Sequence, residues 1–466
     1  MTKINTSHGR RQILKTIAPP LRVSDNQRTA LNDEVLHRLS KGIPLENDPS
    51  LAQLVRPSDG FEPVQRWFTY REGYTVELCR RYFSPTDDLV IDPFCGFGTT
   101  LVAAKAVGLQ SIGLDVNPLA VFVSRVKTRS YTTYQLRLIR RAIDALSCLK
   151  RNANCHPTPA LKILPRLFHE EILDALSRFR FAIESIDNAV VKDFILLAWI
   201  AILEDVSNVY REGNGIKYRN RHRKGNNYSV IPYAEWEQGQ FPSDKFLYVK
   251  ERLIGHLNLM IAEVNHYEGP APVIHQADAA HSQFAVPPKG ASLALFSPPY
   301  CNCFNYIKAY KLELWMAGFI QTYPDIRLLT QMGMRSRLES LLDPVKEPYP
   351  QIIENLVALM KANDLWSPQL PDMIRGYFAD MLRTLTAIFL SLREGGKCVV
   401  TVGNSCYAGV LIPSDLLLCQ VAKSAGFVVE KLVVARHLTT SSQQKRMLAD
   451  STKVFLRESV LHFRKP

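Results

Sequence analysis

The sequence predicts an α/β fold with a mainly parallel β-sheet, and two observations carry this prediction. A short apolar run, Leu89-Val90-Ile91, stops at Asp92 and is followed by a glycine-rich turn and a helical segment at 99–107. Beyond residue 375, short apolar runs again alternate with segments of helical pattern. Strands that alternate with helices form βαβ units, whose strands lie parallel in one sheet.

The elements of the first part follow in chain order. Residues 1–60 are polar and interrupted by prolines, so we expect an N-terminal arm with a short helix near 28–40. Segment 70–83 carries apolar side chains spaced for one buried helical side. Strand 89–91, the turn, helix 99–107 and a second strand at 111–114 make 61–119 the first part of the α/β domain.

The pattern then changes. Residues 120–270 are mostly helical and form a large insertion, with a basic segment at 211–228 that we expect to be a loop. The α/β pattern resumes in 271–466, apart from a loop-and-helix insertion at about 325–370. The expected elements there are strands at 272–276, 292–297, 397–403, 427–435 and 458–464, and helices at 377–392 and 413–425.

The composition excludes several classes of protein. Hydrophobic residues make up 46% of the 466 residues and charged residues 22%, which argues against a mainly disordered chain. No apolar run approaches the roughly 20 residues that cross a bilayer, and the N-terminus lacks a secretory signal, so we expect a cytoplasmic protein without a membrane partner. Nine cysteines without ligand spacing predict neither a disulfide framework nor a metal site. A formal net charge of +13 favours a polyanionic partner.

The strongest local motif is the turn Asp92-Pro93-Phe94-Cys95-Gly96-Phe97-Gly98-Thr99-Thr100. A glycine-rich turn between a strand and a helix lets a ligand approach the backbone, and the helix start offers free N–H groups. Asp115 stands at the end of the next strand, where a carboxylate can accept both hydroxyls of a ribose. The pattern therefore predicts a nucleotide-containing cofactor, and by itself it would also suit a nicotinamide dinucleotide.

A second motif, Ser297-Pro298-Pro299-Tyr300, follows the apolar run near 292–297, at the carboxyl end of a strand where α/β sites form. Two consecutive prolines fix the backbone and have no N–H donors, so the Pro298 carbonyl is available as an acceptor. The Ser297 hydroxyl is a second acceptor, and Tyr300 offers an aromatic face. Two acceptors beside an aromatic plane suit a flat ring with an exocyclic amine.

With both motifs present, the sequence resembles the amino-methyltransferases of DNA, which use S-adenosylmethionine to methylate exocyclic nitrogens. DPFCGFGTT resembles their cofactor loop and SPPY their catalytic tetrapeptide, while IGLDVNPLA at 112–120 and QADA at 276–279 resemble their other cofactor motifs. The resemblance implies a Rossmann-like methyltransferase fold with a mostly parallel seven-stranded sheet and an antiparallel last strand. It implies catalysis by Ser297, Pro298, Pro299 and Tyr300. It also implies that S-adenosylmethionine is bound by Asp92, Phe94, Gly96, Gly98, Thr99, Asp115, Asn117 and Asp278.

Within this family, Ser at the first tetrapeptide position is typical of cytosine-N4 enzymes, and Asp or Asn of adenine-N6 enzymes. The resemblance therefore implies site-specific methylation of cytosine N4 in double-stranded DNA, with adenine-N6 methylation as the alternative. A non-catalytic nucleic-acid-binding protein is an alternative of another class, and RNA is not excluded by charge. Cytosine-C5 methylation is excluded, because its cysteine nucleophile normally follows a proline and no Pro-Cys pair occurs. The resemblance leaves open a separate cognate restriction endonuclease as a partner.

Target recognition is expected in the insertions, because almost nothing follows the last predicted strand. Cations on flexible backbone suit phosphate contacts, and arginine, asparagine or an aromatic ring suits base readout. The basic segment at 211–228 combines these residue types, and a second, smaller candidate is Lys445-Arg446. The predicted DNA-binding residues are Lys217, Arg219, Arg221, Arg223 and Lys224.

Overall fold

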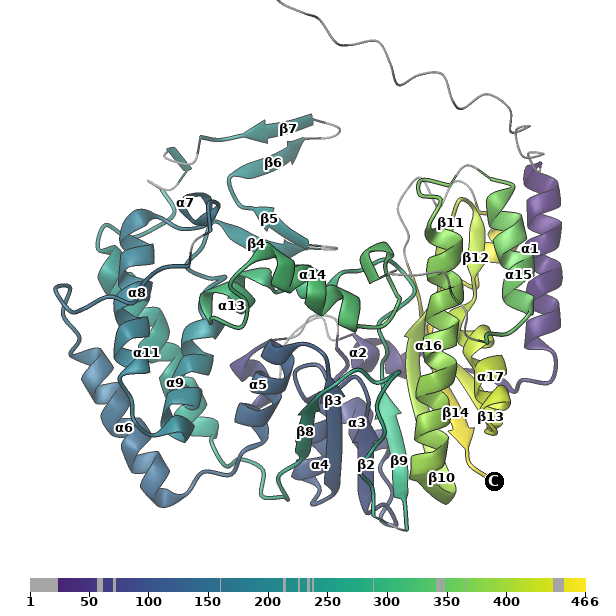
Figure 1. Cartoon of the computed structure of the whole chain (residues 1–466), viewed down its shortest axis with the longest axis horizontal. Coiled ribbons are helices and arrows are strands. Elements are labelled where there is room, and N and C mark those ends of the chain that lie inside the picture. Colours follow the sequence, from purple (N-terminus) through teal and green to yellow (C-terminus); the bar gives the residue numbers. More distant parts are fainter. Residues whose placement is uncertain are drawn as a thin grey trace, which may run out of the picture.

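The computed structural model describes residues 24–56, 62–69, 73–159, 161–212, 215–224, 227–232, 235–236, 239–287, 289–340, 345, 348–363, 365–438 and 448–466. Its main sheet has eight strands in the order β1-β13-β14-β10-β9-β2-β3-β8 (Figure 1). Their bounds in this order are Leu45–Asn47, Val428–His437, Arg457–Arg464, Leu392–Gly403, Ala291–Phe296, Leu89–Asp92, Gln110–Asp115 and Val273–Gln276.

The pairing of the strands confirms the predicted Rossmann-like α/β fold. β14 runs antiparallel to both of its neighbours, β10 and β13, and the other neighbouring pairs are parallel. The seven predicted strands are all present. The sheet also has an eighth, β1, in which Leu45 pairs with Leu432 at the edge. This strand comes from the segment that the sequence assigned to the N-terminal arm.

Alternation along the strands gives the sheet two apolar faces. In β9, Leu293 and Leu295 belong to one buried cluster, and Ala294 and Phe296 belong to another on the opposite face. The first face carries α3, α4 and α5, and the second carries α1, α15, α16 and α17. The bounds of these helices are Val76–Tyr82, Thr99–Ala106 and Pro118–Thr128, then Asp25–Ser40, Ile352–Lys361, Leu370–Ser391 and Ser414–Ser424. The helix predicted over 70–83 begins only at Val76, because the Thr75 hydroxyl caps it by accepting from the Leu78 N–H.

The insertion after α5 is a group of packed helices, which Figure 1 shows beside the sheet. Its main members are α6 (Thr133–Ser147), α8 (Glu170–Glu184), α9 (Ala189–Ala201) and α11 (Lys245–Glu263), and they contact one another. Glu263, at the end of α11, accepts hydrogen bonds from the Val64 N–H (2.8 Å) and the Trp67 indole N–H (3.1 Å). The apolar core is continuous from this group of helices into the first face of the sheet.

The expectation of a loop at 211–228 is wrong, because the structure has two β-hairpins around this segment. β4 (Val209–Glu212) pairs with β5 (Gly215–Tyr218), and β6 (Arg221–Lys224) pairs with β7 (Asn227–Val230). The overlooked signal is the pair of Gly-Asn dipeptides at 213–214 and 225–226, each flanked by β-forming residues. Figure 1 shows β6 and β7 projecting outward beyond β4 and β5.

Three further helices lie between β9 and α15: α12 (Tyr306–Ala309), α13 (Lys311–Met316) and α14 (Tyr323–Met332). Figure 1 shows α13 and α14 between the helical insertion and α16. In the part of the chain that the structure describes, no helix is both long and apolar enough to cross a membrane.

Candidate active site

A cavity lies beyond the carboxyl ends of β2, β3, β8 and β9, and the segment that follows each strand contributes to its wall. Parallel strands place such segments side by side at one edge of the sheet. These wall residues are 93–97 with Thr99, 115–117, 277–279 and 297–299. The other described lining residues are Gly73, Tyr74, Ala120, Tyr306, Ile307, Tyr310, Gly333, Met334 and Arg337.

Asp115 is the carboxylate most firmly fixed in this wall. Its two oxygens accept hydrogen bonds from the backbone N–H groups of Gly96 (3.0 Å) and Asn117 (2.8 Å). Each oxygen keeps a further lone pair, so the carboxylate can still accept two hydroxyl donors. Gly96 has a φ of +50°, a left-handed conformation that favours glycine, and this shape brings its N–H to Asp115. Withdrawal from solvent raises the pKa of Asp115 to about 6.

Asp278 lies on the far side of the same wall, after β8. One carboxylate oxygen accepts the Ala280 N–H at 3.0 Å, and the other lies 2.7 Å from the imidazole Nδ1 of His281. Phe94, Gly96, Thr99 and Asn117 complete the predicted cofactor residues that line the cavity. Six of the eight predicted cofactor residues are therefore brought together.

The other two, Asp92 and Gly98, lie behind the wall. The buried Asp92 accepts from the Thr100 hydroxyl (2.6 Å) and the Phe94 N–H (3.0 Å), so it fixes the turn and the start of α4. Burial raises the pKa of Asp92 to about 7. Gly98 has a φ of +86°, and a Cβ there would lie 2.9 Å from the Ser124 hydroxyl oxygen. A glycine at 98 is therefore required by packing against α5 rather than by contact with a ligand.

Ser297, Pro298 and Pro299 line the cavity, whereas Tyr300 is absent from its described lining. The Tyr300 hydroxyl donates to the Glu458 carboxylate at 2.5 Å and lies 3.5 Å from the Ser297 hydroxyl. Glu458, which is 3% exposed, also accepts from Arg436. The Tyr300 ring packs so closely on β10 that a Cβ on Gly403 would lie 2.8 Å from it. The Tyr300 ring is thus held against β10, with its hydroxyl between Glu458 and Ser297.

Several lining residues were not predicted from the sequence. Tyr306 begins α12 and Tyr310 lies between α12 and α13, both after the tetrapeptide, and Arg337 comes from the insertion at 325–370. The tyrosines could have been found from their closeness to the tetrapeptide in sequence. For Arg337 no local motif exists, because only the fold brings the segment after α14 to the cavity.

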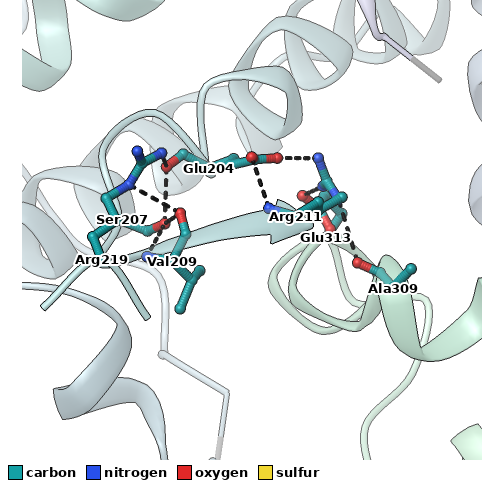
Figure 2. A network of polar contacts seen from close by, with 7 residues as sticks. All are labelled: Glu204, Ser207, Val209, Arg211, Arg219, Ala309 and Glu313. Carbon is teal, nitrogen blue, oxygen red and sulfur yellow. Dashed lines mark hydrogen bonds and ion pairs between the residues drawn. The ribbon is translucent and has the colours of Figure 1, made fainter. Parts of the chain in front are cut away.

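The predicted DNA-binding residues lie on the hairpins rather than in the cavity wall. Lys217 is about half exposed and pairs with Glu212, and the exposed Arg221 stacks its guanidinium 4.7 Å from the centre of the Tyr218 ring. Arg219 differs, because its guanidinium donates to the backbone carbonyls of Val209 (3.2 Å) and Glu204 (3.4 Å) (Figure 2). Arg223 and Lys224 belong to β6, but their side chains lie outside the described structure, as do Lys445 and Arg446 entirely.

A buried ion-pair network joins the first hairpin to the cavity. Figure 2 shows the Arg211 guanidinium, from β4, between the carboxylates of Glu204 and Glu313, and it pairs with both. It also donates to the Ala309 carbonyl at 3.3 Å and lies 4.4 Å from the centre of the Tyr310 ring. Because Tyr310 lines the cavity, one arginine links the base of the basic hairpin to the cavity wall.

No group of three metal-ligating side chains occurs among the described residues. The polar groups in the cavity suit an organic cofactor of the S-adenosylmethionine type. Asp115 presents a fixed carboxylate, Asp278 presents a second hydrogen-bond acceptor, and Gly96 leaves room for close backbone approach.

Comparison with known proteins agrees with this geometry. The family model for DNA methylases of the N6/N4 type matches residues 74–123, which include the glycine-rich turn and Asp115. The Type II methyltransferase M.AvaI of Nostoc sp. is 26% identical over 435 residues, covering 87% of each chain. The Type II methyltransferase M.BsoBI of Geobacillus stearothermophilus is also 26% identical, over 448 residues, covering 87% of this chain and 86% of its own.

Among solved structures, a SAM-dependent methyltransferase from Methanosarcina mazei covers 83% of this chain and 96% of its own, at 8% identity and a TM-score of 0.27. A structural similarity with this TM-score is too low to support a conclusion about function. The two sequence relatives extend over nearly the whole chain, and the matched family model lies on the turn that builds the cavity. The chain is therefore similar over most of its length to Type II DNA methyltransferases, and its cofactor region matches the DNA methylase family model.

Proposed function

We propose that this protein is a site-specific DNA methyltransferase that transfers the methyl group of S-adenosylmethionine to the exocyclic N4 of cytosine in double-stranded DNA. The observation that carries the proposal is that Ser297, Pro298 and Pro299 share one cavity wall with Asp115 and Asp278. An acceptor pair for an amine and a carboxylate for a ribose therefore face the same space. Serine in the first tetrapeptide position supports cytosine N4 over adenine N6.

The bound cofactor would supply an activated methyl group on a sulfonium, which leaves the chain to bind, orient and exclude water. Asp115 would accept the ribose hydroxyls and Asp278 the adenine amino group. The Ser297 hydroxyl and the Pro298 carbonyl would accept the two hydrogens of the target amine. These bonds favour a pyramidal nitrogen whose lone pair is free of the ring, so catalysis rests on positioning and electrostatics.

A cytosine inside a duplex cannot reach this cavity, so the base must be extruded, at a cost of a few kcal/mol. We propose that the insertion at 120–270 reads the target, with its hairpins β4–β5 and β6–β7 contacting the duplex. The exposed Lys217 and Arg221 support this assignment, whereas the hydrogen bonds of Arg219 favour a role in holding the hairpin. The two relatives that align with most of the chain are Type II methyltransferases, which supports a role in restriction-modification beside a separate endonuclease.

The product of the reaction tests the proposal. Genomic DNA from cells that express the protein should contain N4-methylcytosine, which is identified by mass spectrometry of the separated nucleosides. Ser297→Ala should lower the amount formed, because one acceptor for the amine is lost, while binding of S-adenosylmethionine persists. N6-methyladenine as the only product would establish the adenine alternative. Cofactor binding without any methylated base would favour a nucleic-acid-binding protein.

A further inference from the structure

Arg337 is a buried cation in the cavity wall to which the proposed reaction assigns no role. It is 3% exposed, and it is the one arginine or lysine among the described residues that line the cavity. The cavity also holds the carboxyl groups of Asp115 and Asp278, which would meet neutral hydroxyl and amino groups of the cofactor. A ligand group with a negative charge would therefore find Arg337 as its positive partner.

The guanidinium is incompletely bonded within the described part of the chain. Its Nη2 donates to the Thr330 carbonyl at 3.0 Å, whereas the buried Nε has no acceptor there. No carboxylate of the described residues lies within ion-pair distance of it, in contrast to the neighbouring Arg335, which pairs with Asp380 at 2.6 Å. Burial lowers the pKa of Arg337 to about 10, which the charge of Glu339 opposes only in part, so the group stays charged at neutral pH. A buried charge without a hydrogen-bonded ion-pair partner is costly, and an anionic ligand would offset that cost.

The backbone around Arg337 is held in place from two sides. The Ser336 carbonyl accepts the N–H of Cys303, in the loop after the tetrapeptide, at 3.1 Å. Arg335 is tied to Asp380 of α16 by its side chain and also by its backbone N–H (2.9 Å). A Cβ on Gly333 would lie 3.2 Å from the Arg337 Nη2 and 3.5 Å from Val116, directly after β3. The charge is thus fixed between the segment that follows Asp115 and the loop that follows the tetrapeptide.

We propose that Arg337 is an oxyanion-binding residue of the cavity, and that it holds either the carboxylate of the cofactor or the phosphate of the extruded nucleotide. Both groups offer the planar or forked oxygens that a guanidinium binds through paired N–H donors. This inference deepens the proposed function and rests on it, because it assigns one further contact of the same cavity.

The first arm of the test uses the unaltered protein, so it does not depend on a variant that folds. Calorimetry would compare S-adenosylmethionine with its decarboxylated analogue. A second titration would compare a duplex that carries the mapped methylation site with the same duplex bearing neutral methylphosphonates on both sides of the target nucleotide. We expect one of the two ligands that lack the oxyanion to bind about tenfold more weakly, as the loss of one charge-assisted hydrogen-bonded pair requires. The ligand that loses affinity identifies the source of the oxyanion.

The second arm asks whether Arg337 is the residue that senses the charge. Arg337→Gln should bind the ligand with the oxyanion and the ligand without it equally well, and Arg337→Lys should keep part of the difference. Arg327→Gln, an exposed position on α14, is the matched control and should behave as the parent protein. The inference is overturned if neither ligand without the oxyanion loses affinity, or if Arg337→Gln still distinguishes the two ligands of the pair that differed. If the proposed function is wrong, no methylated base will form. The titration with the two forms of the cofactor would still show whether Arg337 binds a carboxylate.

Discussion

Three of the predicted catalytic and cofactor-binding residues are absent from the described lining of the cavity. Asp92 holds the turn through Thr100 and Phe94, Gly98 makes room for Ser124, and Tyr300 is anchored to Glu458. Each therefore fixes the shape of a segment whose neighbours line the cavity. A substitution at such a position is expected to reveal itself first in stability or in positioning, and only indirectly in ligand affinity.

The Asp92 carboxyl should make the stability of the protein depend on pH. Its pKa is raised to about 7 in the folded protein from an ordinary value of 3.8, so the folded state binds the proton more tightly. The stabilisation that this proton provides is fully present below about pH 4 and is lost as the pH rises towards 7. We expect Asp92→Asn to remove much of that slope, measured by urea unfolding of the cofactor-free protein across this range. Parallel pH profiles for the variant and the parent would contradict the assignment.

Tyr300 allows its hydroxyl and its ring to be tested separately. Because the hydroxyl bonds to Glu458 and lies beside Ser297, Tyr300→Phe should lower the methylation rate about tenfold, the effect of one lost hydrogen bond. Affinity for S-adenosylmethionine should stay unchanged by calorimetry, since Tyr300 is absent from the cavity's described lining. A fully active Tyr300→Phe protein beside an inactive Tyr300→Ala protein would instead support a stacking role for the ring.

The sequence could predict the wall residues that directly follow strands, such as Asp115 and Ser297, because local pattern alone places them at the edge of the sheet. The sequence could not predict how Tyr300 is held, since its hydroxyl bonds to Glu458, which is more than 150 residues away in the chain. The place of Arg337 in the cavity could not be predicted from the sequence for the same reason. Its position depends on contacts of its segment with Cys303 and Asp380.

Among the elements, the hairpin β4–β5 is joined to the cavity by a buried charge network rather than by apolar packing alone. Arg211 neutralises two carboxylates, Glu313 with 1% and Glu204 with 13% of the side chain exposed. The strand is thereby fixed to the helices that carry Tyr310. A DNA contact on the hairpin would be held at a defined distance from the reacting groups.

Removing the cation of this network should be costly. Arg211→Met removes the cation that two buried carboxylates share, and we expect a loss of about 3–5 kcal/mol in the free energy of unfolding. Lys217→Ala, which breaks the exposed pair with Glu212 on the same hairpin, should cost only ~0–1 kcal/mol. Urea unfolding of both variants measures the difference. Equal costs for the two substitutions would mean that the network does not secure the hairpin.

For the molecule as a whole, the succession of strands and helices along the chain, and the helical insertion within it, could be predicted from the alternation of patterns in the sequence. The eighth strand was missed because β1 has three residues and all are exposed, so it carries no buried pattern. The hairpins were missed because their charged residues dominate the segment, although Tyr218 and Ile216 show β preference. The charge of this segment thus predicted a polyanionic partner, but it also made the β-hairpins difficult to recognise in the sequence.

The net charge of +13 does not say where a polyanion binds, so the contribution of individual cations must be tested. Lys217 and Arg221 are exposed on the hairpins, whereas Lys289 is exposed beside Asp88, at the amino end of the sheet and away from the cavity. Each phosphate contact contributes about one to the slope of binding against salt concentration on logarithmic axes. The double substitution of Lys217 and Arg221 by Ala should therefore flatten the slope by about two, and Lys289→Ala should leave it unchanged. Fluorescence anisotropy with a labelled duplex at several salt concentrations measures these slopes. If the double variant keeps the slope of the parent protein, the duplex binds elsewhere and the hairpins are not its contact surface.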